Sequence, residues 1–495
     1  MRAKTIFRDY AYLGTTQSVC PDCLQVVPAK IIERRGRVYL RKRCGVHGTR
    51  DDFLCSDVRR FDLMQYSLPG KIPPGLAIEP RLGCPFDCGL CTEHEQHTCI
   101  GVLEITENCN LECPLCYAAS GPGGKHLSVN DCLRAMDSLI ASEGGRAEVL
   151  QLSGGEPTVH PEFLQIFAAA CERPIDIVMI NTNGVRFAKD DQLLAAVAEQ
   201  RQRTEIYLQF DGFDDQVHGT LRGEPLLDVK LRALERLGQA GLRVVLVCTV
   251  EAGVNLSQLG RLVDFGIERP WVTGISFQPA TYVGRYMLPE SLEQRVTFPD
   301  VIDAIVSQSN TWQARDFMPL PCAHPNAHWL AYAYRSSGGV LPVARFVDID
   351  ANLDLLANGI TFNRSHAKTL IEQYLGRMTC GRDCGCGPQL LGIEVAGSPA
   401  SAAASEPASQ HGAAQATEDR LAEEFFRRAI EQTLSPADVF RITTTSFMDA
   451  YNFDVRQLMK SCVHHVLPSG HLIPFSAYNL FYRDGHVKLP ELNRS

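Results

Sequence analysis

Apolar residues follow two alternating periodicities between residue 101 and about residue 309. Short apolar runs typical of strands are separated by stretches in which apolar residues recur at helical spacing. The runs are GVLEIT, AEVLQLS, DIVMIN, EIYLQF, RVVLVCTV and TGISFQ, and the helical stretches include VNDCLRAMDSLIAS, PEFLQIFAAACE and LDVKLRALERLGQA. Six β/α units in succession predict an α/β fold, in which a parallel sheet with helices outside closes fully or partly into a (β/α)6 barrel.

The segments on either side of this core differ from it in pattern. Residues 1–80 predict a metal-binding module of short strands, such as VYLRKRC, and residues 81–100 predict a cysteine-rich knuckle. Residues 310–395 carry further cysteines and are expected to form an auxiliary cluster region. The Ala/Ser-rich stretch 396–418 predicts a flexible linker, and residues 419–495 predict a C-terminal extension that begins with the helix EDRLAEEFFRRAIEQTL.

Composition places the chain among ordinary globular proteins. It has 495 residues, of which 45% are hydrophobic and 21% charged. The net charge of −9 gives no electrostatic reason to expect a nucleic-acid partner. The first residues lack the apolar region of a signal peptide, and no apolar run reaches the roughly 18–20 residues of a spanning helix. We therefore expect a cytoplasmic protein with no transmembrane segment, for which a peripheral membrane contact stays open.

The 19 cysteines change this ordinary picture because most of them occur in clusters. Clustered thiols in a chain without a secretion signal indicate metal ligands rather than disulfides. Cys132, Cys171 and Cys248 instead stand singly in apolar helix or strand patterns. These three are predicted to be buried core residues.

One cysteine cluster directly follows the first strand of the β/α series. In EITENCNLECPLCYA, Cys109, Cys113 and Cys116 form a CxxxCxxC motif. A cluster of four irons needs four ligands, so three cysteines leave one iron open to a substrate or cofactor. A zinc knuckle with similar spacing is the alternative.

This motif, followed by an aromatic residue at the first strand of a six-fold β/α unit, resembles the radical S-adenosylmethionine (radical SAM) superfamily over residues 101 to about 285. The resemblance implies that a 4Fe-4S cluster at the three cysteines binds S-adenosylmethionine and splits it into methionine and a 5′-deoxyadenosyl radical. Tyr117 matches the family's aromatic position near the adenine.

The second strand ends in GGEP, which matches the family's glycine-rich strip at Gly154, Gly155, Glu156 and Pro157. Glycines let the backbone approach the methionine end of the cofactor, and Glu156 could accept a hydrogen bond from its ammonium group. A plain turn before a helix is the alternative reading of these four residues.

Polar residues also stand at the ends of the later strands, where β/α barrels place their active sites. These candidate ribose or substrate contacts, each of which could instead be a turn former, are Asn181, Asn183, Gln209, Asp211 and Gln278.

Further cysteines predict additional metal sites. Four thiols within sixteen residues offer a full set for a closed cluster, and His94 and His97 within the same segment could replace one of them or only hydrogen-bond it. The four are Cys84, Cys88, Cys91 and Cys99.

The N-terminal CPDC motif contributes Cys20 and Cys23. Together with Cys44 it resembles a rubredoxin or zinc-ribbon knuckle, which binds one iron or zinc ion. Either Cys55 or His47 would complete this site. A last group in CGRDCGC, with Cys322 or Cys462 as a partner, predicts another cluster; its cysteines are Cys380, Cys384 and Cys386.

The order of these motifs resembles the branch of the superfamily that contains archaeal tetraether lipid synthase and proteins like 7,8-dihydro-6-hydroxymethylpterin dimethyltransferase. Besides the cysteine segments, SFMDAYNFD and CVHHVLPSGHLIPFSAYN carry this resemblance. It implies one or two auxiliary 4Fe-4S clusters and a mononuclear iron. Ala327 and Ser476 stand where the resemblance predicts cysteines, which leaves the ligands of the last cluster open.

The predicted function is hydrogen abstraction from an unactivated carbon, followed by carbon–carbon bond formation or alkylation of a lipid-like or pterin substrate. An electron donor such as ferredoxin or flavodoxin is expected. No cobalamin-binding segment is recognisable, which makes cobalamin-dependent methyl transfer a poor fit. Peptide maturation and a non-catalytic electron-transfer protein with several clusters are the alternatives.

Overall fold

A large mixed sheet organises the chain in the computed structural model, which describes residues 8–356, 373–374 and 410–493. The six strands predicted from the sequence lie side by side in chain order, and every neighbouring pair is parallel. They are β5 (Ile100–Thr106), β6 (Ala147–Gly154), β7 (Ile175–Thr182), β8 (Thr204–Gln209), β9 (Arg243–Val250) and β10 (Val272–Pro279). The prediction of six β/α units is confirmed.

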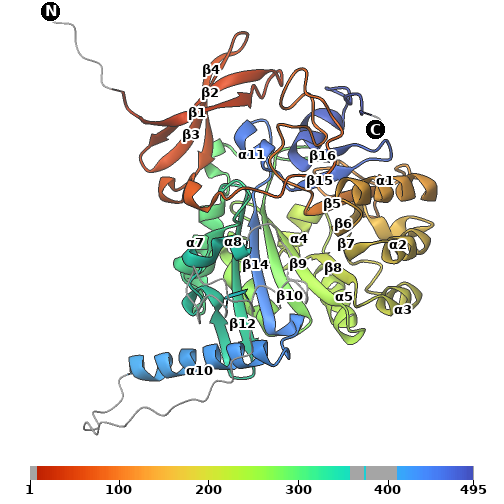
Figure 1. Ribbon diagram of the computed structural model, residues 1–495, viewed down its shortest axis with the longest axis vertical. Coiled ribbons are helices and arrows are strands. Elements are labelled where there is room, and N and C mark those ends of the chain that lie inside the picture. Colours follow the sequence, from red (N-terminus) through yellow and green to blue (C-terminus); the bar gives the residue numbers. More distant parts are fainter. Residues whose placement is uncertain (1–7, 357–372, 375–409, 494–495) are drawn as a thin grey trace, which may run out of the picture.

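Helices between these strands cover the outer face of the sheet (Figure 1). The helix α1 (Val129–Ser142) shows how the sequence sets them: Ser128 caps its N-terminus, and its buried residues recur at helical spacing from Cys132 to Leu139. The others are α2 (Phe163–Glu172), α3 (Asp191–Glu199), α4 (Asp215–Arg222), α5 (Leu227–Gln239), α6 (Leu259–Ile267) and α7 (Phe298–Gln308). The single cysteines Cys132, Cys171 and Cys248 are buried in the same core, as predicted.

The sheet continues past both edges of the six-stranded unit with strands that the sequence did not reveal. Next to β10 lies β14 (Val439–Thr445), which runs parallel to it, and β12 (His328–Ser336) pairs antiparallel with β14. Next to β5, β15 (Val463–Val466) runs parallel. Short partners complete the sheet: β11 (Met318–Pro319), β13 (Gly339–Pro342) and β16 (Leu472–Pro474). The C-terminal extension therefore builds part of the barrel wall.

The N-terminal module is an antiparallel sheet at one end of the molecule, opposite to α10 (Figure 1). Its strands are β1 (Ala11–Val19), β2 (Val26–Arg34), β3 (Arg37–Cys44) and β4 (Gly48–Cys55). From β3, the buried Lys42 pairs with Asp52 at 2.9 Å and donates hydrogen bonds to the carbonyl oxygens of Ala450 (2.6 Å) and Tyr451 (2.8 Å). A paired buried charge thus anchors the module to the C-terminal extension.

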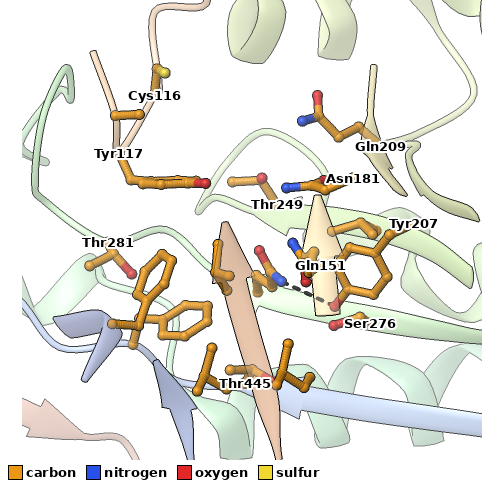
Figure 2. Close-up of a pocket in the computed structure, with 18 of the residues that line it drawn as sticks. Cys116, Tyr117, Gln151, Asn181, Tyr207, Gln209, Thr249, Ser276, Thr281 and Thr445 are labelled. Atoms are coloured by element: carbon orange, nitrogen blue, oxygen red, sulfur yellow. Dashed lines mark hydrogen bonds between the residues drawn. The ribbon is translucent and has the colours of Figure 1, made fainter. Parts of the chain in front are cut away.

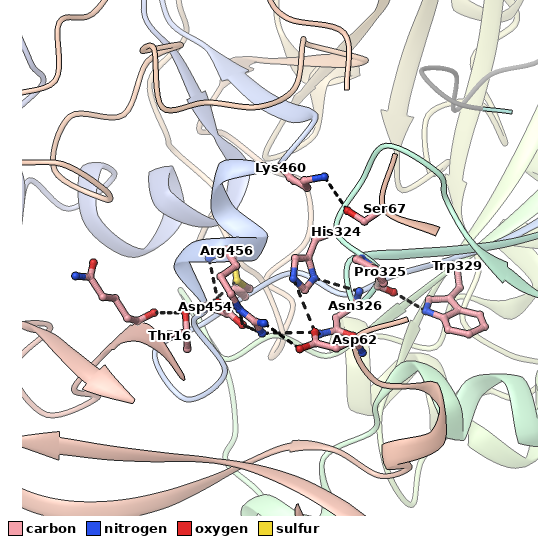
Figure 3. Close-up of polar contacts among 12 residues, drawn as sticks. Thr16, Asp62, Ser67, His324, Pro325, Asn326, Trp329, Asp454, Arg456 and Lys460 are labelled. Carbon is pink, nitrogen blue, oxygen red and sulfur yellow. Dashed lines mark hydrogen bonds and ion pairs between the residues drawn. The ribbon is translucent and has the colours of Figure 1, made fainter. Parts of the chain in front are cut away.

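A polar network joins the N-terminal part, the β11–β12 loop and the C-terminal extension around Asp62 (Figure 3). Arg456 Nη1 donates to Asp62 Oδ2 at 2.9 Å, and Asn326 Nδ2 donates to Asp62 Oδ1 at 2.8 Å. Thr16 Oγ1 in β1 donates to Asp454 at 2.6 Å. These contacts fix segments that lie far apart in the sequence.

The helix α10 (Gln410–Ile430) begins inside the segment predicted as a flexible linker. Residues 410–418 are helical because alanine, glutamine and glutamate there favour helix, so the predicted linker was too long. Residues 396–409 lie outside the described residues. The remaining short helices are α8 (Leu353–Leu356), α11 (Val455–Met459) and α12 (Phe475–Ala477). In the part of the chain that the structure describes, no helix has the length and apolar character needed to cross a membrane.

Candidate active site and metal centres

A cavity of about 1810 Å³, including its open mouth, lies inside the barrel. Cys109, Cys113 and Cys116 all line it, together with Tyr117. The strands β6 to β10 contribute further lining residues from their inward-facing positions, as does β14 (Figure 2). The structure thus brings the CxxxCxxC motif and the ends of the parallel strands to one cavity, as the barrel architecture requires.

The cysteine loop is held by backbone hydrogen bonds and by one arginine. The amide N–H of Cys116 donates to the carbonyl oxygen of Arg285, and the reverse bond is also present, both at 2.9 Å. The Arg285 guanidinium donates to the carbonyl oxygens of Cys113 (3.0 Å), Ala119 (3.1 Å) and Ser120 (2.5 Å). Sequence reasoning missed Arg285, because no motif marks it and it lies 169 residues after Cys116 in the chain.

The glycines of GGEP are required by close approach of the backbone. A Cβ on Gly154 would lie 2.1 Å from the carbonyl oxygen of Thr106, and a Cβ on Gly155 would lie 2.3 Å from that of Asn108. The amide N–H of Gly155 donates to Thr106 at 2.8 Å. Both glycines also line the cavity beside the cysteine loop. No other residue type fits against this loop without moving it.

Glu156 and Pro157 are not placed as expected, because neither lines the cavity. The Glu156 carboxylate is buried and accepts hydrogen bonds from Thr158 Oγ1 (2.6 Å), from Thr182 Oγ1 (2.8 Å) and from the amide of Asn183 (2.7 Å). These three donors hold the carboxylate in place, and the expected contact with an ammonium group stays a prediction. Pro157 is buried at the first position of a short 3₁₀ helix that Glu156 caps.

Four of the predicted strand-end residues line the cavity, namely Asn181, Asn183, Gln209 and Gln278. Asp211 does not line it. Its buried carboxylate accepts two hydrogen bonds from Arg222, Nε to Oδ2 and Nη2 to Oδ1, both at 2.7 Å, and one from the amide of Thr249 at 3.0 Å. The lining residue at this place is Arg222 itself, which the sequence did not single out because it ends the helix α4 rather than a strand.

Two cationic side chains, Arg222 and Lys230, lie close enough to Cys113 to affect its pKa. Burial raises the pKa of Cys113, and the charges of Arg222 and Lys230 oppose that rise. Lys230 Nζ donates to the carbonyl oxygen of Asn183 at 2.7 Å, and burial lowers its pKa to about 8. Burial also raises the pKa of Cys109 to about 12. The two cations therefore lie on the Cys113 side of the motif, whereas the charges that act on Cys109 come from Glu156 and the other two cysteines.

Neutral hydrogen-bonding groups line part of the barrel interior, among apolar side chains such as Met179, Val247 and Leu330. Gln278 Nε2 donates to the Tyr207 hydroxyl at 3.3 Å (Figure 2). Asn181 Nδ2 donates to Ser153 Oγ at 3.1 Å. Further amide and hydroxyl groups come from Gln151, Thr249, Ser276, Thr281, Thr443 and Thr445. Those of these six residues that belong to strands lie within or at the ends of apolar runs. The sequence pattern therefore did not indicate that they line a site.

A second cavity, with about 2780 Å³ of empty space, is lined from the amino ends of β7 to β10 and by α10. Many of its lining side chains are apolar, including Phe317, Met318, Phe425 and Phe426. Arg441 of β14 lines both cavities.

The N-terminal module gathers four possible ligands of one ion. The ligand atoms of Cys20, Cys23, Cys44 and His47 all lie within 4.8 Å of one another. Backbone N–H groups of His47 and Val46 lower the pKa of Cys44 to about 6, which favours the thiolate that metals bind. Of the two residues left open for the fourth position, the structure places His47 with the three cysteines. Cys55, expected as a possible ligand, instead packs in the core, with Sγ 3.5 Å from the carbonyl oxygen of Asp57.

The second cysteine segment divides into two places. The charges of Cys84, Cys88 and Cys91 act on one another, so these thiols lie together. Cys99 does not join them, which corrects the expected set of four: its amide donates to the carbonyl oxygen of Cys462 at 2.9 Å. The cause is the pairing of β15 with β5, which brings the C-terminal extension to the start of the first barrel strand.

Cys322 and Cys462 are both buried near Cys99. The neighbouring Cys462 thiol raises the pKa of Cys99, and the pKa of Cys462 is lowered by Cys99 and by His328. Ala327 is buried, and Ser476 accepts a hydrogen bond from the amide of Met448 at 2.9 Å. Cys380, Cys384 and Cys386 lie outside the described residues.

Comparison with known proteins decides the family. Residues 103–266 match the model of the Radical SAM superfamily, and residues 12–56 match that of the HMPTM N-terminal zinc ribbon domain. The chain is 30% identical to 7,8-dihydro-6-hydroxymethylpterin dimethyltransferase of Methanocaldococcus jannaschii, over 94% of each chain. The chain belongs to the radical SAM superfamily. It is a radical SAM enzyme, and its family implies a 4Fe-4S cluster and S-adenosylmethionine.

Two further similar proteins match a smaller share of the chain. Mycofactocin maturase MftC of Mycolicibacterium smegmatis is 30% identical over 36% of this chain and 43% of its own length. Among solved structures, Streptococcus suis SuiB matches with a TM-score of 0.36 and 17% identity, covering 43% of this chain and 48% of that chain. The similarity to the pterin dimethyltransferase, in contrast, includes the N-terminal module and the C-terminal extension.

Proposed function

We propose that this radical SAM enzyme alkylates a pterin-like substrate, and that Cys109, Cys113 and Cys116 hold the 4Fe-4S cluster that starts the reaction. One observation carries the proposal: three cysteines and two glycines line the same cavity. Neighbouring backbone leaves no room for a Cβ atom at either glycine. Three thiols and an open fourth position fit a cluster that binds a cofactor at its free iron.

The other residues of the site fit the remaining parts of S-adenosylmethionine. Arg222 lines the cavity beside Cys113 and is fixed by Asp211, so it is suited to pair with the cofactor's carboxylate. Gly154 and Gly155 present backbone close to the cysteines, where the ammonium group would lie. Tyr117 offers an aromatic face to the adenine. When bound, the cluster and S-adenosylmethionine supply an electron and a 5′-deoxyadenosyl radical.

The barrel interior supports a polar, flat substrate. Amide and hydroxyl groups on neighbouring strands, among them Gln151, Tyr207 and Gln278, can donate to and accept from the edges of a pterin ring. A saturated hydrocarbon chain offers no hydrogen bond to these groups, and each buried group that it covers and that has no protein partner would cost about 1–3 kcal/mol. Aromatic side chains at Phe447 and Phe475 give the ring a surface to stack on.

A lipid-like substrate is the second candidate, favoured by the apolar cavity at the other end of the barrel. Because Arg441 lines both cavities, a long chain could extend from one toward the other. The polar groups nearest the cysteines argue for the pterin-like substrate first.

The additional thiols are proposed to serve electron transfer and stability. The Cys20, Cys23, Cys44 and His47 group fits one zinc ion, supported by the match to a zinc ribbon model. Cys84, Cys88 and Cys91 are proposed ligands of an auxiliary 4Fe-4S cluster, and an electron donor such as ferredoxin or flavodoxin would reduce the enzyme.

The test is substrate-dependent formation of 5′-deoxyadenosine by the anaerobically reconstituted, dithionite-reduced protein. Addition of 7,8-dihydro-6-hydroxymethylpterin is expected to raise the rate several-fold and to consume the pterin, because the 5′-deoxyadenosyl radical takes a hydrogen atom from it. Saturated phospholipid vesicles are the comparison. If only the phospholipid raises the rate, or only it is consumed, the lipid-like candidate replaces the pterin.

A further inference from the structure

The loop between β10 and α7 lies directly against the cysteine loop. Its residue Gly284, at φ +66°, packs so closely that a Cβ atom there would collide with the carbonyl oxygens of Cys116 and Tyr117. The next residue, Arg285, pairs with the backbone of Cys116 and donates from its guanidinium to the carbonyl oxygen of Cys113 at 3.0 Å. The positions of Cys113 and Cys116 therefore depend on where this loop lies.

Both ends of this loop, residues 282–295, are tied to one carboxylate of the C-terminal extension. The amide N–H of Tyr282 donates to Asp449 Oδ2 at 2.9 Å, and Arg295 Nη2 donates to the same oxygen. Asp449 is fully buried, and Arg295 is 5% exposed. The Arg295 guanidinium also lies over the Tyr282 ring, 4.4 Å from its centroid, so the two ends of the loop contact each other. Asp449 thus closes the loop at its base.

Arg295 depends on Asp449 for its pairing. The Nε and Nη1 donors of Arg295 are buried and have no hydrogen-bond partner among the described residues. Burial raises the pKa of Glu251, and the charge of Arg295 opposes that rise, so Glu251 is a second carboxyl group near the guanidinium. A buried cation that loses its hydrogen-bonded counter-charge is strongly destabilising. Without the Asp449 charge, we expect the Arg295 end of the loop to shift.

The Asp449 carboxylate is itself held in a well-bonded turn. The amide of Asp449 donates to Asn452 Oδ1 at 2.7 Å, and the amide of Tyr451 donates to Asp449 Oδ1 at 2.9 Å. The buried Lys42 of the N-terminal module donates to the carbonyl oxygens of Ala450 and Tyr451 in the same turn. Because its backbone is fixed by these contacts, the carboxylate can hold the loop in one position.

We propose that Asp449 is a positioning residue of the cluster site. By closing the 282–295 loop, Asp449 sets Gly284 and Arg285 against the cysteine loop, which places Cys113 and Cys116 for S-adenosylmethionine cleavage. The proposal rests on the assignment of a 4Fe-4S cluster to the CxxxCxxC motif and is independent of the substrate. The six β/α units alone therefore do not complete the radical site, because the residue that closes this loop belongs to the C-terminal extension.

Asp449→Asn tests this role in the full chain, reconstituted without oxygen. The new side chain keeps its shape and an acceptor for the Tyr282 amide but loses the charge that pairs with Arg295. We expect wild-type iron and sulfide content, with release of the cluster into an iron chelator about 10- to 100-fold faster than in the wild type. Formation of 5′-deoxyadenosine should fall by a similar factor, and S-adenosylmethionine should perturb the electron paramagnetic resonance signal of the reduced cluster less.

Asp454→Asn is the matched control. Asp454 belongs to the same extension, is 2% exposed and pairs with Arg456 at 2.7 Å, but its partners Arg456 and Thr16 lie outside the 282–295 loop. This variant should lose stability yet release the cluster at the wild-type rate. If Asp449 acts through Arg285, Asp449→Asn/Arg285→Ala should release the cluster more slowly than the product of the two single effects predicts.

Asp449→Asn/Arg295→Met guards against loss of folding, because it removes the tie without leaving Arg295 as an unpaired buried charge. It should also release the cluster about 10- to 100-fold faster than the wild type. Wild-type release in this variant, or equally fast release in Asp454→Asn, would overturn the proposal. Absence of 5′-deoxyadenosine from the wild type would instead count against the assignment of the cluster itself.

Discussion

Replacing Arg285 with alanine removes a clamp on the cysteine loop without touching a cysteine. Its guanidinium donates to the carbonyl oxygens of Cys113, Ala119 and Ser120, and its backbone pairs with Cys116. The backbone pair survives the substitution. Only the three side-chain hydrogen bonds are lost, so the variant tests the clamp itself.

The size of the effect follows from these three bonds. Arg285 is only half-buried, and the freed carbonyl groups can bind water, so each bond contributes about 1 kcal/mol rather than the larger value of a buried charged bond. A loss of about 3 kcal/mol in the stability of the cysteine loop corresponds to about a 100-fold lower affinity of the loop for the cluster. Arg285→Lys should restore part of it, since an ammonium group can reach one of the three carbonyl groups.

The assay is release of the cluster into an iron chelator, followed by the electron paramagnetic resonance signal that S-adenosylmethionine perturbs. That signal distinguishes the open cluster from the others. We expect release to be about 100-fold faster in Arg285→Ala, while Arg173→Ala, which removes an arginine that donates to Asp137 and Ala169, behaves as the wild type. Equal release rates in Arg285→Ala and the wild type would refute the assignment of Arg285 as a clamp.

Three further predictions concern the supports of the site. Gly154→Ala should lower the free energy of unfolding by about 2–5 kcal/mol and abolish S-adenosylmethionine cleavage, because the new Cβ would meet the backbone of Thr106. The control is Gly253→Ala, which is also at positive φ but in open space, and this variant should cleave S-adenosylmethionine at the normal rate. Asp211→Asn should cost about 3–5 kcal/mol in urea unfolding, since it leaves the buried Arg222 without its partner, and unchanged stability would contradict the pairing. Burial lowers the pKa of His465 to about 4, so the unfolded chain binds more protons than the folded one between pH 4 and 6.5. The free energy of unfolding therefore falls as the pH drops through that window. His465→Gln should remove about 3 kcal/mol of this fall, and a pH profile identical to that of the wild type would argue against the assignment.

The repeating part of the fold could be predicted from the sequence because each strand and helix carries its own periodicity. All six strands and helix α1 lie where the pattern placed them. The strands β12, β14 and β15 were missed because their partners are distant in sequence, and no local pattern records that β14 pairs with β10. The same non-local pairing moved Cys99 away from Cys84, since β15 carries Cys462 to it.

At the site, residue types with a local motif were found and those placed by tertiary contacts were not. The cysteines and glycines carry fixed spacing, and they line the cavity. Arg222 lines the cavity from the end of a helix, Arg285 holds the backbone of the cysteine segment from a loop, and neither has a motif. Glu156 shows the converse, because its motif was clear but its carboxylate caps a buried turn.

The most direct test of the account compares wild-type protein with Cys109→Ala/Cys113→Ala/Cys116→Ala, both reconstituted without oxygen and reduced with dithionite. The wild type is expected to form 5′-deoxyadenosine from S-adenosylmethionine. The triple variant should lose this activity together with the iron and sulfide of one cluster, while it retains its zinc. Absence of 5′-deoxyadenosine from a wild type with its clusters intact, or its formation by the triple variant, would contradict the central claim.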